Sequence, residues 1–209
     1  MVILSSPIVL RAQSTFANLN FENPILPLDP NDPFGVPIAN ALPGWTGYIG
    51  SNQTDRVFYN GISIGAPAIS LQGPGSLQPV LQGSYSVLLQ GSTAGVPASA
   101  AMGQTGRTPQ DARSIVFFAQ ALFSFQVTFD GHYIPPVLLE TTPNYLIIAG
   151  DISTFAGQSG ELRFTAAPQY FASLDNIFFS IQPIPEPSTF CLFGLGALLL
   201  RWRFLCKRP

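Results

Sequence analysis

A short alternating segment followed by a turn constrains the fold of this chain more than any other feature. Between Phe123 and Phe129, phenylalanine and valine alternate strictly with serine, glutamine and threonine. Alternation with a period of two is the pattern of a β-strand that has one buried and one polar face. The next residues, Asp130 and Gly131, form a preferred two-residue hairpin turn. The segment therefore predicts an antiparallel hairpin with one face in a core.

Further short apolar segments, each bounded by Gly, Pro, Ser or Asn, recur along the chain. We expect strands at residues 16–21, 57–59, 62–64, 68–71, 85–89, 145–149, 162–165 and 174–181. The small and polar residues 92–111 predict a mobile loop. With 19 Gly and 20 Pro in 209 residues, the chain favours an all-β sandwich or barrel with little helix.

Charge and cysteine are divided unevenly between the body and the C-terminal tail. Residues 1–188 carry five Arg and eleven acidic residues, whereas residues 189–209 carry four basic residues and no acid. Because a nucleic-acid-binding surface is normally basic, we expect no nucleic-acid partner. Both cysteines, Cys191 and Cys206, lie in the tail, so no disulfide stabilises the body.

Residues 184–209 combine a polar motif, an apolar run and a basic end. The motif is Pro185, Glu186, Pro187 and Ser188, the apolar run includes Phe190, Leu192, Leu195, Leu198 and Leu200, and the basic end holds Arg201, Arg203, Lys207 and Arg208. The run is shorter than the about 20 residues of an ordinary span, so we expect a single short hydrophobic helix. Its basic end should stay in the cytoplasm, which places the body outside. These properties alone suit either a removable sorting signal or an ordinary membrane anchor.

The order of motif, apolar run and basic end resembles the PEP-CTERM sorting signal, also known as an ice-binding-protein C-terminal domain. This resemblance implies processing by exosortase, a membrane-bound cysteine protease or transpeptidase. It also implies export across the inner membrane, transient anchoring by the C-terminal helix, and delivery to the cell surface or the extracellular space. The expected partners are therefore exosortase, the membrane and extracellular polysaccharide.

The N-terminal residues 1–13 contain an apolar stretch without the positive region that begins a leader. Because the tail implies export, we interpret them as a truncated or misassigned secretion signal, with a disordered cytosolic N-terminus as the alternative. The chain between the two ends is long enough for one domain with a sizeable core. We expect one β-sandwich at 14–183 and the sorting signal at 184–209.

Several short segments of the body resemble the galactose-binding-like jelly roll of many carbohydrate-binding modules. They are Asn20-Phe21-Glu22, Pro43-Gly44-Trp45 and Leu174-Asp175-Asn176-Ile177, together with segments between residues 151 and 164. The resemblance implies an all-β, jelly-roll-like antiparallel β-sandwich. It also implies a structural calcium ion, for which Glu22 and Asp175 would supply carboxylates. The alternative is that both side chains cap strand ends.

Aromatic residues of the body are candidates for carbohydrate binding. Trp45, Tyr48 and Tyr85, with Tyr59 and Tyr133, could stack on the apolar faces of sugar rings. The alternative is that most of these rings pack in the core. We expect a body that binds carbohydrate or has a structural role in the polysaccharide matrix.

Signals for an enzyme are weak in this sequence. The only histidine, His132, follows the hairpin turn, and no nucleophile-elbow motif occurs. We therefore expect a non-catalytic protein. The alternative is a secreted carbohydrate-active hydrolase that uses a pair of carboxylates, which only a structure can bring together.

Overall fold

The computed structural model describes residues 14–32, 35–122 and 125–184. The predicted secretion signal at 1–13 and the predicted sorting, anchor and basic residues from Pro185 onward lie outside the described residues. Within the described ranges, no helix is long and apolar enough to cross a membrane.

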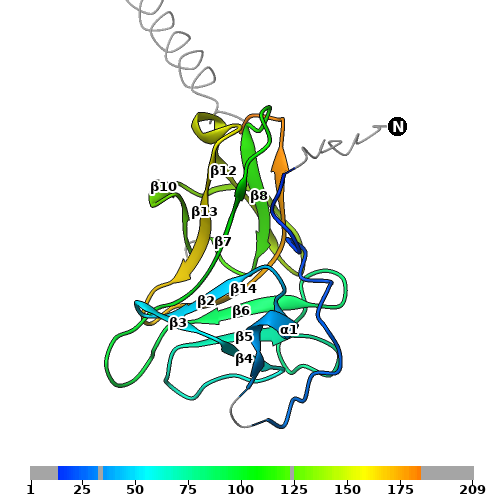
Figure 1. The fold of residues 1–209 in the computed structure, drawn as a ribbon, viewed down its shortest axis with the longest axis vertical. Coiled ribbons are helices and arrows are strands. Elements are labelled where there is room, and N and C mark those ends of the chain that lie inside the picture. Colours follow the sequence, from blue (N-terminus) through cyan, green and yellow to red (C-terminus); the bar gives the residue numbers. More distant parts are fainter. Residues whose placement is uncertain (1–13, 33–34, 123–124, 185–209) are drawn as a thin grey trace, which may run out of the picture.

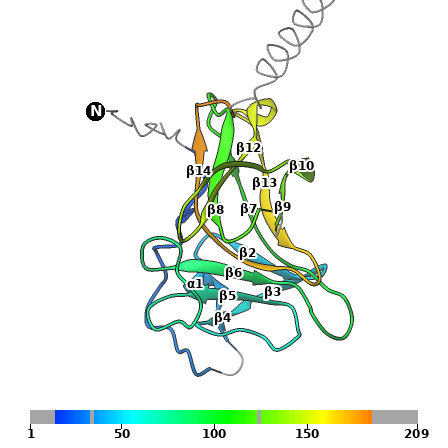
Figure 2. The same cartoon turned by 180° about the vertical axis from the view of Figure 1, so that it is seen from behind.

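The described chain is built from two β-sheets (Figures 1 and 2). The eight-stranded sheet has the order β1-β4-β5-β6-β14-β8-β12-β11, and the six-stranded sheet has the order β10-β9-β13-β7-β2-β3. All neighbouring pairs are antiparallel except β4 and β5, which are parallel. The predicted all-β sandwich is therefore confirmed, with one parallel pair that the antiparallel pattern did not include.

The elements have the following bounds. The eight-stranded sheet contains β1 (Val36–Pro37), β4 (Arg56–Tyr59), β5 (Ala68–Gln72), β6 (Ser86–Gln90), β8 (Ser114–Ala119), β11 (Val137–Thr141), β12 (Leu146–Asp151) and β14 (Phe171–Ser180). The six-stranded sheet contains β2 (Thr46–Ile49), β3 (Asn52–Thr54), β7 (Ala100–Arg107), β9 (Gln126–Phe129), β10 (His132–Ile134) and β13 (Ser159–Ala166). Two short helical turns complete the list, α1 (Ile38–Ala41) and the 3-10 turn η1 (Ser153–Phe155).

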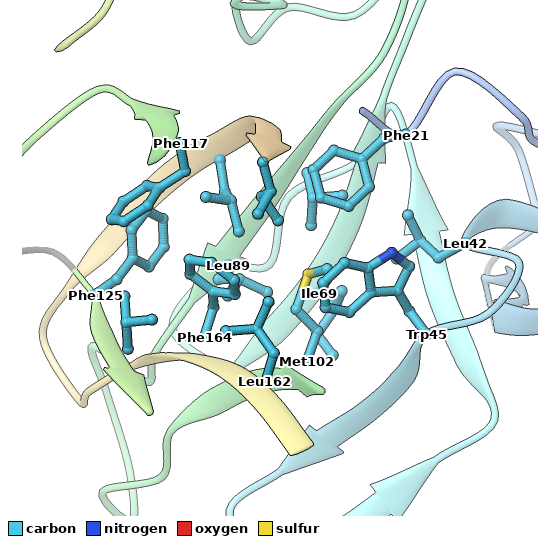
Figure 3. Packing of buried hydrophobic residues seen from close by; sticks show 14 of the residues in the cluster. Phe21, Leu42, Trp45, Ile69, Leu89, Met102, Phe117, Phe125, Leu162 and Phe164 are labelled. Carbon is cyan, nitrogen blue, oxygen red and sulfur yellow. The ribbon is translucent and has the colours of Figure 1, made fainter. Parts of the chain in front are cut away.

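The core lies between the two sheets (Figure 3). Along β13, Leu162 and Phe164 are fully buried while their neighbours are only partly buried, as the alternation predicts. The ring of Phe164 meets that of Phe117 on β8 edge to face, with centroids 5.2 Å apart. Such contacts join one sheet to the other and exclude water from the interior.

The predicted hairpin after the alternating segment is confirmed. Phe129 pairs with His132 across the turn, and Val127 and Phe129 are buried. Asp130 and Gly131 have φ values of 47° and 78°. Positive φ at both central residues is the geometry of the type I′ two-residue hairpin turn.

The predicted first strand at 16–21 is wrong. Asn18 and Phe21 have φ values of 49° and 57°, which turn the backbone out of an extended conformation. The segment is instead held from both sides, because Trp45 Nε1 donates a hydrogen bond to Asn18 O (3.1 Å) and Ile177 N donates one to Leu19 O (2.9 Å). It therefore forms an anchored turn that buries Phe21.

Two further predictions about local structure are wrong. The region 92–111, expected to be a mobile loop, contains β7, which pairs with both β13 and β2. Its strand residues are mostly small, so they carry little strand propensity of their own. No strand forms at 62–64, where Ile62 and Ile64 are 54% and 100% exposed.

A second apolar cluster lies outside the main core. It contains Leu81 together with residues of β8, β12 and β14, namely Val116, Phe118, Ala149 and Phe178. Tyr145, Ile147 and Ile184 pack against it as partly buried side chains. We call this set the outer cluster. Phe118 and Phe178 alternate along their strands with core residues, so the cluster occupies the opposite face of the eight-stranded sheet.

Candidate carbohydrate-binding face

The face of the six-stranded sheet that points away from the core is aromatic and polar. We call it the outer face, and it holds Thr46, Tyr48, Gln53, Ala101, Gly103, Thr105, Arg107, Gln126, Thr128, Tyr133, Ser159, Glu161, Arg163 and Thr165. Residues directly opposite each other in paired strands share a face, which fixes this membership. Amide, hydroxyl, guanidinium and phenol groups thus gather on one flat surface.

The centre of the outer face is a three-residue cluster. Arg163 binds Glu161 through two hydrogen bonds, Nε to Oε2 at 2.9 Å and Nη2 to Oε1 at 3.0 Å. The guanidinium also lies over the Tyr48 ring, with Cζ 4.0 Å from the centroid. Tyr48 Oη donates to Glu161 Oε1 at 3.3 Å. Each side chain thus fixes the other two, which orients them before any ligand arrives.

The local sequence of β7 makes this cluster possible. Arg163 on β13 and Tyr48 on β2 lie two strands apart, about 10 Å, with β7 between them. The β7 residues beneath the cluster are Ala101 and Gly103, the smallest available. A Cβ on Gly103 would lie 2.5 Å from Glu161 Oε1. The small residues therefore let long side chains cross the strand.

The charge state of the cluster is set by the same contacts. Hydrogen bonds to Glu161 raise the pKa of the Arg163 guanidinium, while burial opposes the rise. Arg163 therefore stays charged, and its charge is matched by the carboxylate of Glu161. The side chains remain accessible, with 32% of Arg163 and 30% of Glu161 exposed. The cluster offers donors and acceptors without a net charge.

Tyr133 extends the aromatic character of the outer face toward its other edge. It pairs with Thr128, which in turn pairs with Arg163, so all three lie in one cross-strand row. Tyr133 is 53% exposed. A flat and exposed ring beside hydroxyl and guanidinium groups is the combination that a sugar ring requires.

The three aromatic residues predicted to bind sugar do not lie together. Tyr48 is on the outer face, but Trp45 is 4% exposed and packs in the core against Phe21, which is the alternative given for it. Its ring face is therefore closed to a ligand. Tyr85 precedes β6 of the other sheet, and a Cβ on Gly73 would lie 2.6 Å from its ring.

The two carboxylates predicted to bind calcium do meet, on either side of the turn before β6. Glu22 Oε1 accepts hydrogen bonds from Ser84 N and Tyr85 N, at 2.9 and 3.0 Å. Asp175 Oδ2 accepts from Gln82 N at 2.9 Å and Ser86 Oγ at 2.8 Å, and Oδ1 accepts from Asn176 N at 2.6 Å. Glu22 Oε1 and both oxygens of Asp175 thus accept hydrogen bonds from the turn and from β6 and β14.

This donor set fits the capping role given as the alternative. Calcium takes about 6 to 8 oxygen ligands, whereas N–H and O–H groups point at these carboxylates. The described residues contain no group of three or more His, Cys, Asp or Glu side chains that could hold a metal ion. The hydrogen bonds favour the capping role, and the calcium ion stays a prediction.

Two features could bear on catalysis, the single histidine and a hollow beside β14. His132 is exposed, and its Nδ1 lies 3.1 Å from Asp130 O. A hollow of about 290 Å³ between the N-terminal segment and β14 is lined by Ser14, Phe16, Leu19, Asn20, Ile177, Phe178 and Phe179, without a carboxylate or histidine.

Sequence reasoning missed Glu161 and Arg163. The sequence Glu-Leu-Arg-Phe-Thr at 161–165 alternates polar and apolar residues, so it does place both on one strand face. No local signal links them to Tyr48, which lies more than a hundred residues earlier in the chain.

Comparisons with solved structures identify similar folds. A cyclase from Fischerella sp., in its apo form, matches with a TM-score of 0.50 and 12% identity, over 82% of this chain and 96% of that one. The enzymatically active domain of tailspike protein 4 from bacteriophage CBA120 matches with a TM-score of 0.39 and 15% identity, over 73% and 21%. A family 11 carbohydrate-binding module from Clostridium thermocellum, in complex with a β-1,3-1,4-mixed-linked tetrasaccharide, matches with a TM-score of 0.36 and 15% identity, over 73% and 93%. At 12% identity, the likeness to the Fischerella protein concerns the fold alone.

Comparison with protein families identifies the C-terminus. No curated protein matches the chain. Residues 183–208 match the PEP-CTERM protein-sorting motif. The predicted sorting signal is therefore confirmed, and the motif marks the chain as an exported protein.

Proposed function

We propose that this chain is an exported, non-catalytic protein that exosortase sorts through residues 183–208, and that its body binds extracellular polysaccharide through the outer face. The observation that carries the binding proposal is the preordered cluster of Tyr48, Glu161 and Arg163. It sits in a row of polar side chains with the exposed ring of Tyr133 at the edge. A ligand that stacks on rings and accepts and donates hydrogen bonds fits this surface.

The charge balance favours a neutral polysaccharide. The only charged pair in the centre of the outer face, Arg163 and Glu161, is internally matched. The body as a whole is acidic, since residues 1–188 carry eleven acids and five Arg. An anionic polymer would therefore meet long-range repulsion from the acidic body.

The binding proposal is tested by Tyr133→Ala and a matched control. Tyr170 is 52% exposed, almost as much as Tyr133, and it lies in the turn before β14. Loss of one stacked ring costs about 1 kcal/mol, so we expect about fivefold weaker binding for Tyr133→Ala. Tyr170→Ala should bind like the unmodified chain.

The measurement is affinity electrophoresis of the purified chain in gels that contain neutral polysaccharides, with an anionic polysaccharide for comparison. Equal retardation of both variants on every bound polymer would contradict the assignment to the outer face. Absence of retardation on the whole panel would favour the structural role in the matrix.

The absence of catalysis is proposed because three carboxylates that could take part in a hydrolytic pair already hold other groups. Glu161 is bound to Arg163, and Glu22 and Asp175 hold backbone groups. We expect no reducing ends to appear when the chain is incubated with the polysaccharides that it binds. Their release, if abolished by Glu161→Gln, would establish a hydrolase instead.

The sorting proposal is tested by intact mass and cell fractionation in a host with exosortase and in the same host without it. We expect release of the body without the C-terminal residues only when exosortase is present. Full-length protein in the membranes of both hosts would show an ordinary anchor.

A further inference from the structure

The backbone stays bound to the folded body for a few residues beyond the end of its last strand. After Ser180, at the end of β14, Ser114 Oγ donates a hydrogen bond to Gln182 O at 2.8 Å. Gln182 N donates to Ser180 Oγ at 3.0 Å. These bonds hold the backbone of Gln182 against the ends of β8 and β14.

Two residues later, Ile184 packs against the outer cluster as a partly buried side chain. The same cluster contains Phe118, whose ring stacks on that of Tyr145 with centroids 4.4 Å apart and planes 10° apart. Antiparallel sheets commonly present polar residues on the face that turns away from the core. Here that face is apolar, and Ile184 covers part of it.

Ile184 belongs to both the body and the sorting segment. The sorting motif covers residues 183–208, and Pro185 follows Ile184 directly. The bonds to Gln182 and the packing of Ile184 therefore leave no free spacer between the folded body and the motif. A processing enzyme that binds an extended peptide needs residues on both sides of its target to be accessible.

We propose that the outer cluster is a docking site for Ile184, and that this docking withholds the start of the sorting motif from exosortase until residues 181–184 detach. This inference rests on the proposed sorting function. When docking and detachment are fast relative to cleavage, the processing rate follows the detached population. Weakening the docking site therefore accelerates processing.

One test variant changes a residue of the folded body, and the other changes Ile184 itself. Ser114→Ala removes the donor to Gln182 without changing the sorting motif, and Ile184→Ala removes the docked side chain. Each loses one hydrogen bond or a few half-buried methyl groups, so we expect processing about three- to fivefold faster. Ile64→Ala is the control, because Ile64 is 100% exposed on a distant loop.

A variant with an inserted spacer distinguishes an effect on docking from an effect on recognition of the motif. Inserting a flexible Gly-Ser segment between Ile184 and Pro185 supplies an accessible peptide even while Ile184 stays docked. In that background, Ser114→Ala and Ile184→Ala should be processed at the same rate as the parent. Rates are followed by pulse-labelling and intact mass in the exosortase-containing host, and thermal melts confirm that each variant folds.

A second readout does not depend on exosortase. Limited proteolysis of the purified full-length chain, followed by mass spectrometry, measures cleavage within residues 181–184. We expect about three- to fivefold faster cleavage there in Ser114→Ala and Ile184→Ala than in Ile64→Ala.

The outcomes distinguish the two proposals. If the unmodified chain is not processed by exosortase, the sorting function fails, and the proteolysis rates alone decide on docking. If the chain is processed but neither variant changes the processing rate, or the proteolysis rates are equal, the docking proposal is overturned.

Discussion

The buried carboxyl group of Asp175 makes the stability of the body depend on pH. Burial raises its pKa from 3.8 to about 6, the charge of Glu22 adds to the rise, and hydrogen bonds from Ser86, Gln82 and Asn176 oppose it. Only 1% of the residue is exposed. Because the folded chain binds this proton more tightly than the unfolded chain, protonation stabilises the fold.

The magnitude follows from the two pKa values. The stabilisation is fully present below about pH 3.8 and is lost as the pH rises through about 6. A pKa difference of about 2 corresponds to about 3 kcal/mol. For a chain of this size, that change lowers Tm by about 6–12 °C.

Other carboxyl groups also titrate between pH 3 and 7, so the test compares the chain with Asp175→Asn. We expect the free energy of unfolding of the unmodified chain, minus that of the variant, to fall by about 2 to 2.5 kcal/mol between pH 4 and pH 7, because part of the effect is already lost at pH 4. Urea denaturation at several pH values measures it. Asp111→Asn is the control, because Asp111 is exposed. A difference between the chain and Asp175→Asn that stays constant with pH would refute the reasoning.

Three further predictions follow from packing and from the carboxylate caps. Gly91→Ala should lower the free energy of unfolding by about 2–3 kcal/mol, because the new Cβ would lie 2.1 Å from Ala167 O. Gly95→Ala, where no atom lies within 4 Å of the new Cβ, should lower it by about 1 kcal/mol, and equal urea midpoints for the two variants would contradict this. Phe164→Ala should cost about 3–5 kcal/mol and Phe171→Ala, at a site 60% exposed, less than about 1 kcal/mol, as measured by denaturant unfolding. Millimolar calcium should shift Tm by less than about 1 °C, because the hydrogen bonds to Glu22 and Asp175 favour a capping role; a rise of several degrees that a chelator reverses would show that these carboxylates bind the ion.

The sequence predicted those parts of the fold in which local pattern and tertiary structure agree. The alternation before Phe129 and the Asp130-Gly131 turn determine a hairpin by themselves, because both signals are local. The segment at 16–21 failed for the opposite reason. Its apolar residues suit a strand, but positive φ at Asn18 and Phe21 depends on contacts with Trp45 and Ile177, which are distant in the sequence.

Strand β7 shows a second limit of sequence reasoning. Its small residues carry no strand signal, yet they are needed for what packs on either side of the sheet. A Cβ on Gly106 would lie 2.8 Å from the ring of Phe16, and one on Gly103 would meet Glu161. Which residue fits at such a position depends on the side chains packed against it in space, and a local sequence pattern does not include those side chains.

The candidate site could be predicted only in part. Tyr48 was identified and does lie on the outer face, whereas Trp45 belongs to the core and Tyr85 to the other sheet. Composition identifies aromatic residues, but strand register decides which face they occupy. The meeting of Glu22 and Asp175 around one turn followed from the fold resemblance, while their hydrogen-bond donors were visible only in the structure.

The sheet edges described above bear on how densely such an exported protein can be packed. Open strand edges recruit strands from other molecules and so start aggregation. Here β1 is two residues long and contains Pro37, and β3 and β10 have three residues each. The longer edge strand β11 is interrupted by an irregularity between Leu138 and Glu140, which places a bulge and a negative charge on the edge. Each edge is thus short or broken, so molecules crowded at a cell surface can touch without fusing their sheets into fibrils.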